Sequence, residues 1–271
     1  MKIFFRILTT FFFLAMIALA YYVIDNANLA AKYSQEVISY QTVEEKLDTE
    51  LKVFLDSVSF GIYDGGEEKT DSIEQAITLL EAHKQKLELY SYILLGMSTL
   101  LLLLSWFFMR QLAFLNLILM SLTALVVGLL TPVLSFTAFQ DLPIIGQVVF
   151  KYDSRGILGS IVKLFETKSF FVAGVLFLFS VIVPFIKILL SLLMHFKGNS
   201  LPVNKIAKIL HNIGKWSMLD VFVVAVFLAL FALEQDGLTD ARAGIGLYFF
   251  ASYVLFSMLA SQIFASYHQK K

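Results

Sequence analysis

Long apolar runs separated by short polar segments dominate the pattern of hydrophobic and polar positions along the chain. A helix needs roughly 20 residues to cross the hydrocarbon core of a bilayer, and the helices of soluble proteins rarely stay apolar on every face for that length. Six such runs occur, at Ile3–Ile24, Leu89–Met109, Leu112–Leu134, Phe170–Met194, Met218–Leu233 and Gly244–Ala265. The pattern therefore predicts an all-α integral membrane protein with about six transmembrane helices.

The first run differs from a cleaved signal peptide, although Lys2 and Arg6 lie at its start. An apolar signal-peptide core has about 7–15 residues, whereas this run is about 20 residues long. The flanking sequence YYVIDNANLAAKYS is also a poor cleavage site. We therefore expect an uncleaved membrane anchor.

The positive charges orient the predicted helices. The segments expected on one side carry nine Lys/Arg and no acidic residue. Because short cytoplasmic loops are rich in Lys and Arg, both chain termini are expected in the cytoplasm. The nine basic residues are Lys2, Arg6, Arg110, Lys197, Lys205, Lys208, Lys215, Lys270 and Lys271.

The longest extracytoplasmic segment, Asp25–Glu88, has apolar residues at steps of three or four, which is typical of one face of a helix. Phe60–Asp71 is expected to be a turn, and Asp71 with Glu74 to cap a second helix. This predicts a helical hairpin between the first two spans, which is either a docking surface or a rigid connector. The apolar positions before the turn are Leu29, Tyr33, Val37, Tyr40, Val43, Leu47, Leu51, Phe54 and Val58.

The second extracytoplasmic segment, Ser135–Lys168, has a different pattern. Gln147–Tyr152 is compatible with a short strand. Ser154–Thr167 has Ile157, Ile161, Leu164 and Phe165 on one side. It is expected to form an amphipathic helix that lies at the membrane surface or in a covered loop.

Composition and motifs exclude most forms of chemistry. The formal net charge is zero, so nothing favours nucleic acid. There is no cysteine, the four histidines are far apart in sequence, and no catalytic motif is present. We therefore expect neither an enzyme, nor a bound metal, nor a cofactor.

Ionisable residues inside membrane spans are rare and mark functional candidates. Lys187 follows Pro184 in the fourth run, and Asp220 lies just inside the fifth run. Both are expected at a similar depth, so they could pair across neighbouring helices. Alternatively, Lys187 extends to the headgroups and Asp220 caps its helix. Pro184 is expected to kink the fourth span.

Gly214–Phe222 reads GKWSMLDVF and resembles the signature of the paraquat-inducible protein A family of bacterial inner-membrane proteins. The proline and lysine of the fourth run are similar to the same family, as is Pro132 at the end of the third run. The resemblance covers about Leu112–Ala265. Its signature positions are Trp216, Ser217, Met218, Asp220 and Val221.

The resemblance implies a fold and a role. It divides the chain into a two-span unit with the hairpin, residues 1–111, and a four-span family module, residues 112–271. It further implies a multi-pass protein of the bacterial inner membrane that moves membrane lipid between that membrane and a periplasmic partner of the mammalian-cell-entry (MCE) type and so supports envelope integrity. The cysteine-rich zinc ribbons of longer family members are missing from this sequence.

Two alternative functions remain open at this point. A proton- or ion-coupled small-molecule transporter would use Lys187 and Asp220 as its coupling pair. A membrane interaction protein of the stress response would carry no cargo.

The orientation can be tested by thiol labelling, because the chain has no cysteine of its own. In spheroplasts, a membrane-impermeant thiol reagent should label Gly65→Cys and Gln235→Cys but not Gly198→Cys. Labelling of the cysteine at position 198 in intact spheroplasts would reverse the predicted orientation. Labelling after lysis provides the accessibility control.

Overall fold

The computed structural model of the chain describes residues 2–40, 52, 65–108, 110–142, 146–197 and 239–268. Within these residues, 5 helices are long and apolar enough to cross a membrane. This confirms the predicted class of helical membrane protein. The predicted span Met218–Leu233 lies outside the described residues, so the count of six remains a prediction. The five spans are Ile7–Ser39, Asp71–Ser105, Ala113–Leu130, Phe170–Leu193 and Ile245–Gln262.

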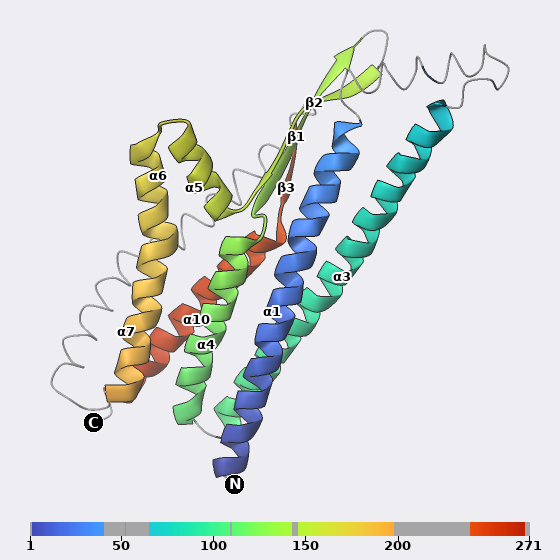
Figure 1. Cartoon of the computed structure of the whole chain (residues 1–271). Coiled ribbons are helices and arrows are strands. Elements are labelled where there is room, and N and C mark those ends of the chain that lie inside the picture. The colour runs from blue at the N-terminus through green and yellow to red at the C-terminus, as the bar shows by residue number, and fades with distance from the viewer. Residues whose placement is uncertain are drawn as a thin grey trace.

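Two long helices, α1 (Lys2–Ser39) and α3 (Gly65–Phe108), lie side by side along one flank of the molecule (Figure 1). They have 38 and 44 residues. At about 1.5 Å per residue, each is far longer than the ~30 Å hydrocarbon core. Both helices must therefore continue beyond the bilayer, as the helical pattern of the first extracytoplasmic segment predicted.

The predicted start of the second hairpin helix is wrong. The helix begins at Gly65, so Asp71 and Glu74 lie inside it and do not form its cap, and the turn cannot extend to Asp71. A pair of polar residues three positions apart marks a helix start only when the backbone before it is not helical. Here the backbone before Asp71 is already helical, so Asp71 and Glu74 are exposed residues within the helix.

Small residues and one side-chain hydrogen bond join α1 to α3. Ala27 and Ala30 are buried on α1, and small residues at such positions let two helix backbones approach closely. The Asn26 side-chain amide donates to the Tyr22 carbonyl at 2.8 Å, and its oxygen lies 2.9 Å from His83 Nδ1. Because an amide oxygen only accepts, His83 Nδ1 carries the proton in this contact.

Helix α4 (Arg110–Leu130) is the most buried of the described spans. It contacts α1 and α3 on one side and α10 (Ile245–His268) on the other. The third apolar run was expected to stay helical to Leu134, but α4 ends at Leu130. Pro132 explains this end, because proline disfavours helical conformation in the residue before it and donates no backbone hydrogen bond.

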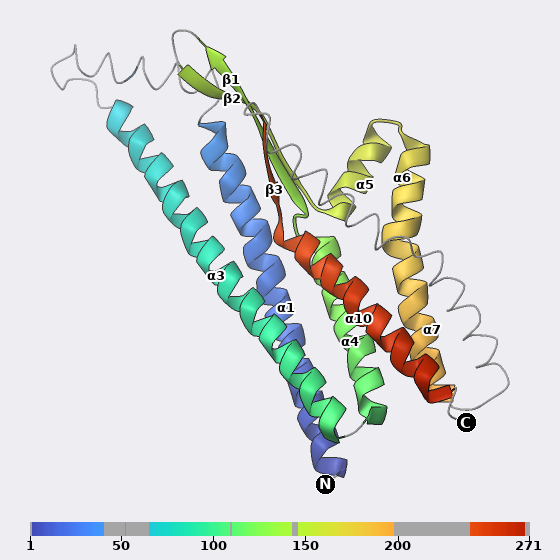
Figure 2. The same cartoon turned by 180° about the vertical axis from the view of Figure 1, so that it is seen from behind.

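A three-stranded antiparallel sheet stands at the end of the molecule opposite to the start of α1 (Figures 1 and 2). Its order is β2-β1-β3. The strands are β1 (Leu134–Leu142), β2 (Gly146–Arg155) and β3 (Thr239–Ala243). The predicted strand Gln147–Tyr152 is confirmed within β2, whereas the other two strands were not predicted.

The chain then turns back through α5 (Ile157–Glu166) into α6 (Phe170–Phe177), and α5 confirms the predicted amphipathic helix. Lys168, between them, has φ 61°, a left-handed conformation that reverses the chain direction. The Phe165 and Phe170 rings pack across this corner with centroids 6.2 Å apart. Helix α5 thus lies directly against the start of the fourth span.

The fourth span is interrupted where a kink was expected. The π-helical turn η1 (Leu178–Ile182) separates α6 from α7 (Val183–Lys197). Pro184, near the start of α7, has no backbone N–H, and its ring would clash with the carbonyl four residues earlier in a regular α-helix. The wider turn at η1 relieves this clash, so the disturbance takes the form of a π-helical turn.

Helices α7 and α10 both end at the face of the molecule where α1 starts, and β3 lies at the opposite face (Figure 1). The chain that leaves α7 therefore re-enters the described structure at the other end. This is the arrangement that the predicted span Met218–Leu233 requires.

The contact between α4 and α10 depends on Gly128. A Cβ atom there would lie 2.8 Å from the Phe250 backbone nitrogen, which can move only if the helices separate. We expect Gly128→Ala to destabilise the protein by about 1–3 kcal/mol, as overpacking does elsewhere. Thermal unfolding in detergent would measure the loss.

Gly96→Ala on α3 is the matched control, because a Cβ atom at this position would meet nothing within 4 Å. Alanine favours helix over glycine by about 0.5–1 kcal/mol, so this variant should be unchanged or slightly stabilised. Equal effects of the two substitutions would show that the α4–α10 contact is not tight.

Candidate functional site

One face of the fourth span is polar although the span crosses the apolar part of the protein. Ser180, Lys187 and Ser191 are buried, and Pro184 lies between them on the same face. The steps of three and four residues place all of them on one side of the helix. The opposite side exposes Phe185, Ile186 and Leu189. The polar face therefore points into the protein and the apolar face points outward.

Lys187 is the one residue of the predicted membrane pair that the described structure contains, and only 9% of its surface is exposed. Its backbone carbonyl accepts a hydrogen bond from the Ser191 hydroxyl at 2.8 Å. The next residue, Ile188, belongs to the core that includes Phe114 and Leu117 of α4. The lysine is thus held inside the protein.

His195 continues this face toward the end of α7. Its imidazole lies over the Phe114 ring of α4, with ring centroids 6.0 Å apart. Burial lowers the pKa of the His195 imidazole below its usual value, so the neutral form is favoured near neutral pH. The four histidines are far apart from one another in sequence. His195 nevertheless follows Lys187 by eight residues, a spacing that places both on one face of a helix.

The other predicted residues of the pair and the signature lie outside the described residues. These are Trp216, Ser217, Met218, Asp220 and Val221. The pairing of Lys187 with Asp220 therefore remains a prediction.

Pro132, by contrast, has a clear structural place. Its carbonyl accepts the Gly246 backbone N–H at 2.9 Å, and the neighbouring Val133 carbonyl accepts the Gly244 N–H at 2.8 Å. A Cβ atom at Gly246 would lie 2.7 Å from the Thr131 carbonyl oxygen. The Thr131–Pro132 corner thus anchors the start of α10 to the end of α4.

Buried polar residues of α4 mainly satisfy helix backbone. The Ser121 hydroxyl donates to the Leu117 carbonyl at 2.7 Å, as is common for serine within helices. Asn116 is different, because its side-chain nitrogen donates to the Ser105 hydroxyl of α3 at 3.1 Å. This hydrogen bond links α4 to α3.

A cavity of about 300 Å³ lies between the sheet and α5. It combines apolar and charged walls, and the sequence pattern did not indicate it. Arg155 Nε lies 2.6 Å from an Asp153 carboxylate oxygen, and Lys163 Nζ lies 3.4 Å from Glu166 on the outer side. The lining residues are Leu134, Phe136, Asp153, Arg155, Ser160, Lys163 and Leu164.

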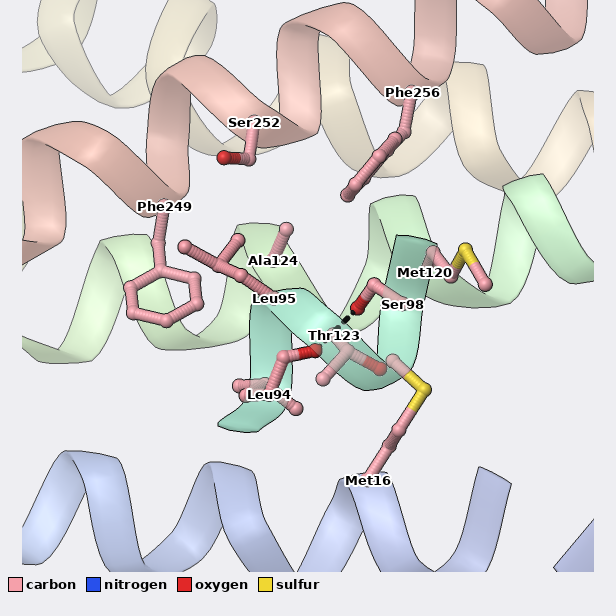
Figure 3. A pocket seen from close by; sticks show the side chains of 10 residues that line it. All are labelled: Met16, Leu94, Leu95, Ser98, Met120, Thr123, Ala124, Phe249, Ser252 and Phe256. Carbon is pink, nitrogen blue, oxygen red and sulfur yellow. Dashed lines mark hydrogen bonds between the residues drawn. The ribbon is translucent and has the colours of Figure 1, made fainter. Parts of the chain in front are cut away.

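A second cavity, shown in Figure 3, has only about 10 Å³. It lies among α1, α3, α4 and α10, and its walls are mostly apolar side chains such as Met16, Met120 and Phe249. The Ser98 hydroxyl points into this region but donates to the Leu94 carbonyl at 2.7 Å. A space of this size holds at most about one water molecule. It is a packing seam and offers no room for a ligand.

Among the described residues, no group of three or more His, Asp or Glu side chains is placed to hold a metal ion. The polar face of α7 and the cavity between the sheet and α5 both combine charged groups, hydrogen-bonding groups and apolar surface. This arrangement can bind a molecule that is polar at one end and apolar at the other.

The bundle of long apolar helices, closed at one end by a sheet and an amphipathic helix, defines a polytopic helical membrane protein. A family model described as "Paraquat-inducible protein A" matches residues 112–269, which is more than half of the chain. The chain belongs to the paraquat-inducible protein A family, as the resemblance indicated. No solved structure matches it.

Curated relatives are similar to this chain over about 40% of its length. The chain is 32% identical over 114 residues to "Intermembrane transport protein PqiA" of Escherichia coli (strain K12), covering 40% of this chain and 27% of the relative. It is 30% identical over 116 residues to "Probable intermembrane transport protein" of Haemophilus influenzae, covering 41% and 27%. It is 32% identical over 110 residues to "Lipophilic envelope-spanning tunnel protein A" of Escherichia coli (strain K12), covering 38% and 25%. The matched stretch therefore spans about a quarter of each relative.

The predicted pair can be tested by a double-mutant cycle on stability. If Lys187 and Asp220 interact, Lys187→Met and Asp220→Asn should each lower the free energy of unfolding, because each leaves a buried charge without its partner. Breaking such a pair costs about 3–5 kcal/mol in soluble proteins, whereas removing both charges can be nearly neutral. The double variant should therefore lose less stability than the sum of the single variants.

Ile186→Met provides the control on the exposed side of the same helix. It should unfold like the unchanged protein. Additive losses for the two charged positions would show that Lys187 and Asp220 do not interact.

Proposed function

We propose that this protein is a non-enzymatic inner-membrane subunit that moves lipid between the inner membrane and a periplasmic partner. The observation that carries the proposal is Lys187, a cationic side chain buried on the inward face of a membrane span. A charge at that depth costs several kcal/mol unless polar groups compensate it, and such residues mark the paths of polar cargo. A lipid headgroup that passes along the inward face can add its negative charge to the groups that surround the lysine.

The names of the relatives support the same role. Two are named for intermembrane transport and one for an envelope-spanning tunnel. Because they share only about a quarter of their length with this chain, cargo and partner are part of the proposal. Residues 112–271 would act as the transport module and residues 1–111 as an accessory unit.

The extension of α1 and α3 beyond the bilayer suggests where the partner binds. With both termini in the cytoplasm, this helix pair and the sheet would face the periplasm together. An MCE-type protein is the proposed partner, since a tunnel across the periplasm would receive lipid at that face. The stacked Tyr33 and His83 rings, with centroids 5.6 Å apart, join the two helices, which together would form the docking surface.

A second candidate function is proton- or ion-coupled transport of a small molecule. The arrangement that favours it is the placement of Lys187 and His195 on the same inward face of α7. Two titratable groups on one face can relay a proton along a transport path. This function, unlike passive lipid handling, requires an ion gradient.

The proposal predicts which molecules remain bound after gentle purification. Mass spectrometry of the protein in mild detergent should detect phospholipid, and a periplasmic tunnel protein should co-purify. The Lys187→Met/Asp220→Asn double variant should fold but retain several-fold less lipid, and should fail to restore envelope integrity in a deletion strain.

Ile186→Met, on the lipid-facing side of the same helix, should retain lipid and restore integrity. Full activity of the double variant would show that the buried charges are structural. Uptake of a small molecule that stops when the proton gradient is collapsed would instead support the second function.

A further inference from the structure

The cavity between the sheet and α5 has two walls that face each other. On the sheet, Leu134 pairs with Arg155 and Phe136 pairs with Asp153 across neighbouring strands. Cross-strand partners point to the same side of a sheet, as do alternate residues of one strand. One sheet face therefore presents two apolar side chains next to an acid and a base.

The other wall comes from α5. Ser160, Lys163 and Leu164 are spaced by three and four residues, so they share one face of the helix. This wall carries a hydroxyl, a cation and an apolar side chain but no acidic residue. The cavity is thus amphipathic on both sides.

The charges of the cavity are mixed. Two cations, Arg155 and Lys163, and one carboxylate, Asp153, line it. Lys163 also lies 3.4 Å from the carboxylate of Glu166, which is not part of the lining. Asp153 lies 2.6 Å from Arg155 Nε, so it partly neutralises the group that is best suited to bind phosphate. An anion-only site would be weakened by this carboxylate, whereas a ligand that carries both a phosphate and an ammonium group can use all three charges.

The outer side of α5 shows how such a ligand would arrive. Val162 and Phe165 of α5 and Phe170 and Phe171 of α6 are exposed, and Phe171 has 83% of its surface exposed. Exposed apolar side chains on a helix beside a membrane span are typical of burial in the interfacial region of a bilayer. If these side chains enter the bilayer, α5 alone lies between the cavity and the lipid leaflet.

We propose that this cavity binds the headgroup of a zwitterionic glycerophospholipid of the phosphoethanolamine type, taken from the adjacent leaflet. Arg155 and Lys163 hold the phosphate, and Asp153 accepts hydrogen bonds from the ammonium group. The volume of about 300 Å³ matches the lower end of ligand pockets. It suits a headgroup whose acyl chains remain along the apolar outer face of α5 and α6.

This inference deepens the proposed function by naming the lipid class, and it is tested by binding alone. The full chain in detergent micelles is titrated with phosphatidylethanolamine or phosphatidylglycerol of identical acyl chains, and bound lipid is counted by native mass spectrometry. The unchanged protein should bind phosphatidylethanolamine more tightly. Asp153→Asn should shift the preference at least tenfold toward phosphatidylglycerol, because it removes the partner of the ammonium group and frees Arg155 for the anion.

Matched controls separate this effect from general loss of charge. Asp71→Asn, at an exposed position of α3, should keep the original preference. Lys163→Gln should weaken both lipids at least several-fold, whereas Lys168→Gln, which lies outside the cavity, should not. Ser160→Phe fills the cavity without changing its charge and should abolish binding of both lipids, which keeps the test valid if a charge variant unfolds.

Three results would overturn the inference. The first is tighter binding of phosphatidylglycerol than of phosphatidylethanolamine by the unchanged protein. The second is an unchanged lipid preference in Asp153→Asn. The third is binding of soluble glycerophosphoethanolamine as tight as that of phosphatidylethanolamine, which would show that no lipid is required. If the protein keeps its lipid preference but cannot support envelope integrity, the proposed function is wrong. The proposed binding site is not contradicted by that result.

Discussion

The close crossing of α4 and α10 is the contact on which the rest of the described structure depends. Gly128 lets the Phe250 backbone approach α4, and Gly246 places its N–H against the Pro132 carbonyl. Strands β1 and β3 leave this junction as neighbours, with Leu134 opposite Ala243. A wider crossing would separate these two strands and remove β3 from the sheet.

The same junction positions the charged groups. The sheet carries Asp153 and Arg155 beside α5, and α5 leads through a tight corner into the span that buries Lys187. Electrostatic interactions strengthen where water is scarce. A few charges at the edge and in the interior of an apolar bundle can therefore bind a polar headgroup more strongly than the same charges in water. Under the proposed function, the cavity would select the headgroup and the buried lysine would lie on the lipid path.

Helices α1 and α3 form the longest part of the described structure. They share a buried core with α4 and α10 through Met16, Leu94, Met120 and Phe249, and the Asn116–Ser105 hydrogen bond adds a polar link. This packing leaves almost no space at the seam (Figure 3). Motion at the outer end of α1 and α3 would consequently be transmitted to α4 as a rigid body.

The sequence by itself determined the membrane class, most span positions, the helical pattern of α1 and α3, and α5, and it marked Lys187 as a candidate residue. These features follow from local sequence patterns. The length of an apolar run, the helical spacing of apolar residues and an ionisable residue within an apolar run can each be recognised in one segment of the sequence. Only the tertiary structure decided the sheet partners, the glycine contacts and the cavity. Strand β3 lies about a hundred residues from β1, and Asp153, Arg155 and Lys163 form one site only when a sheet and a helix face each other. Pairing between distant segments depends on backbone hydrogen bonds and side-chain packing that leave no periodic signal in either segment alone.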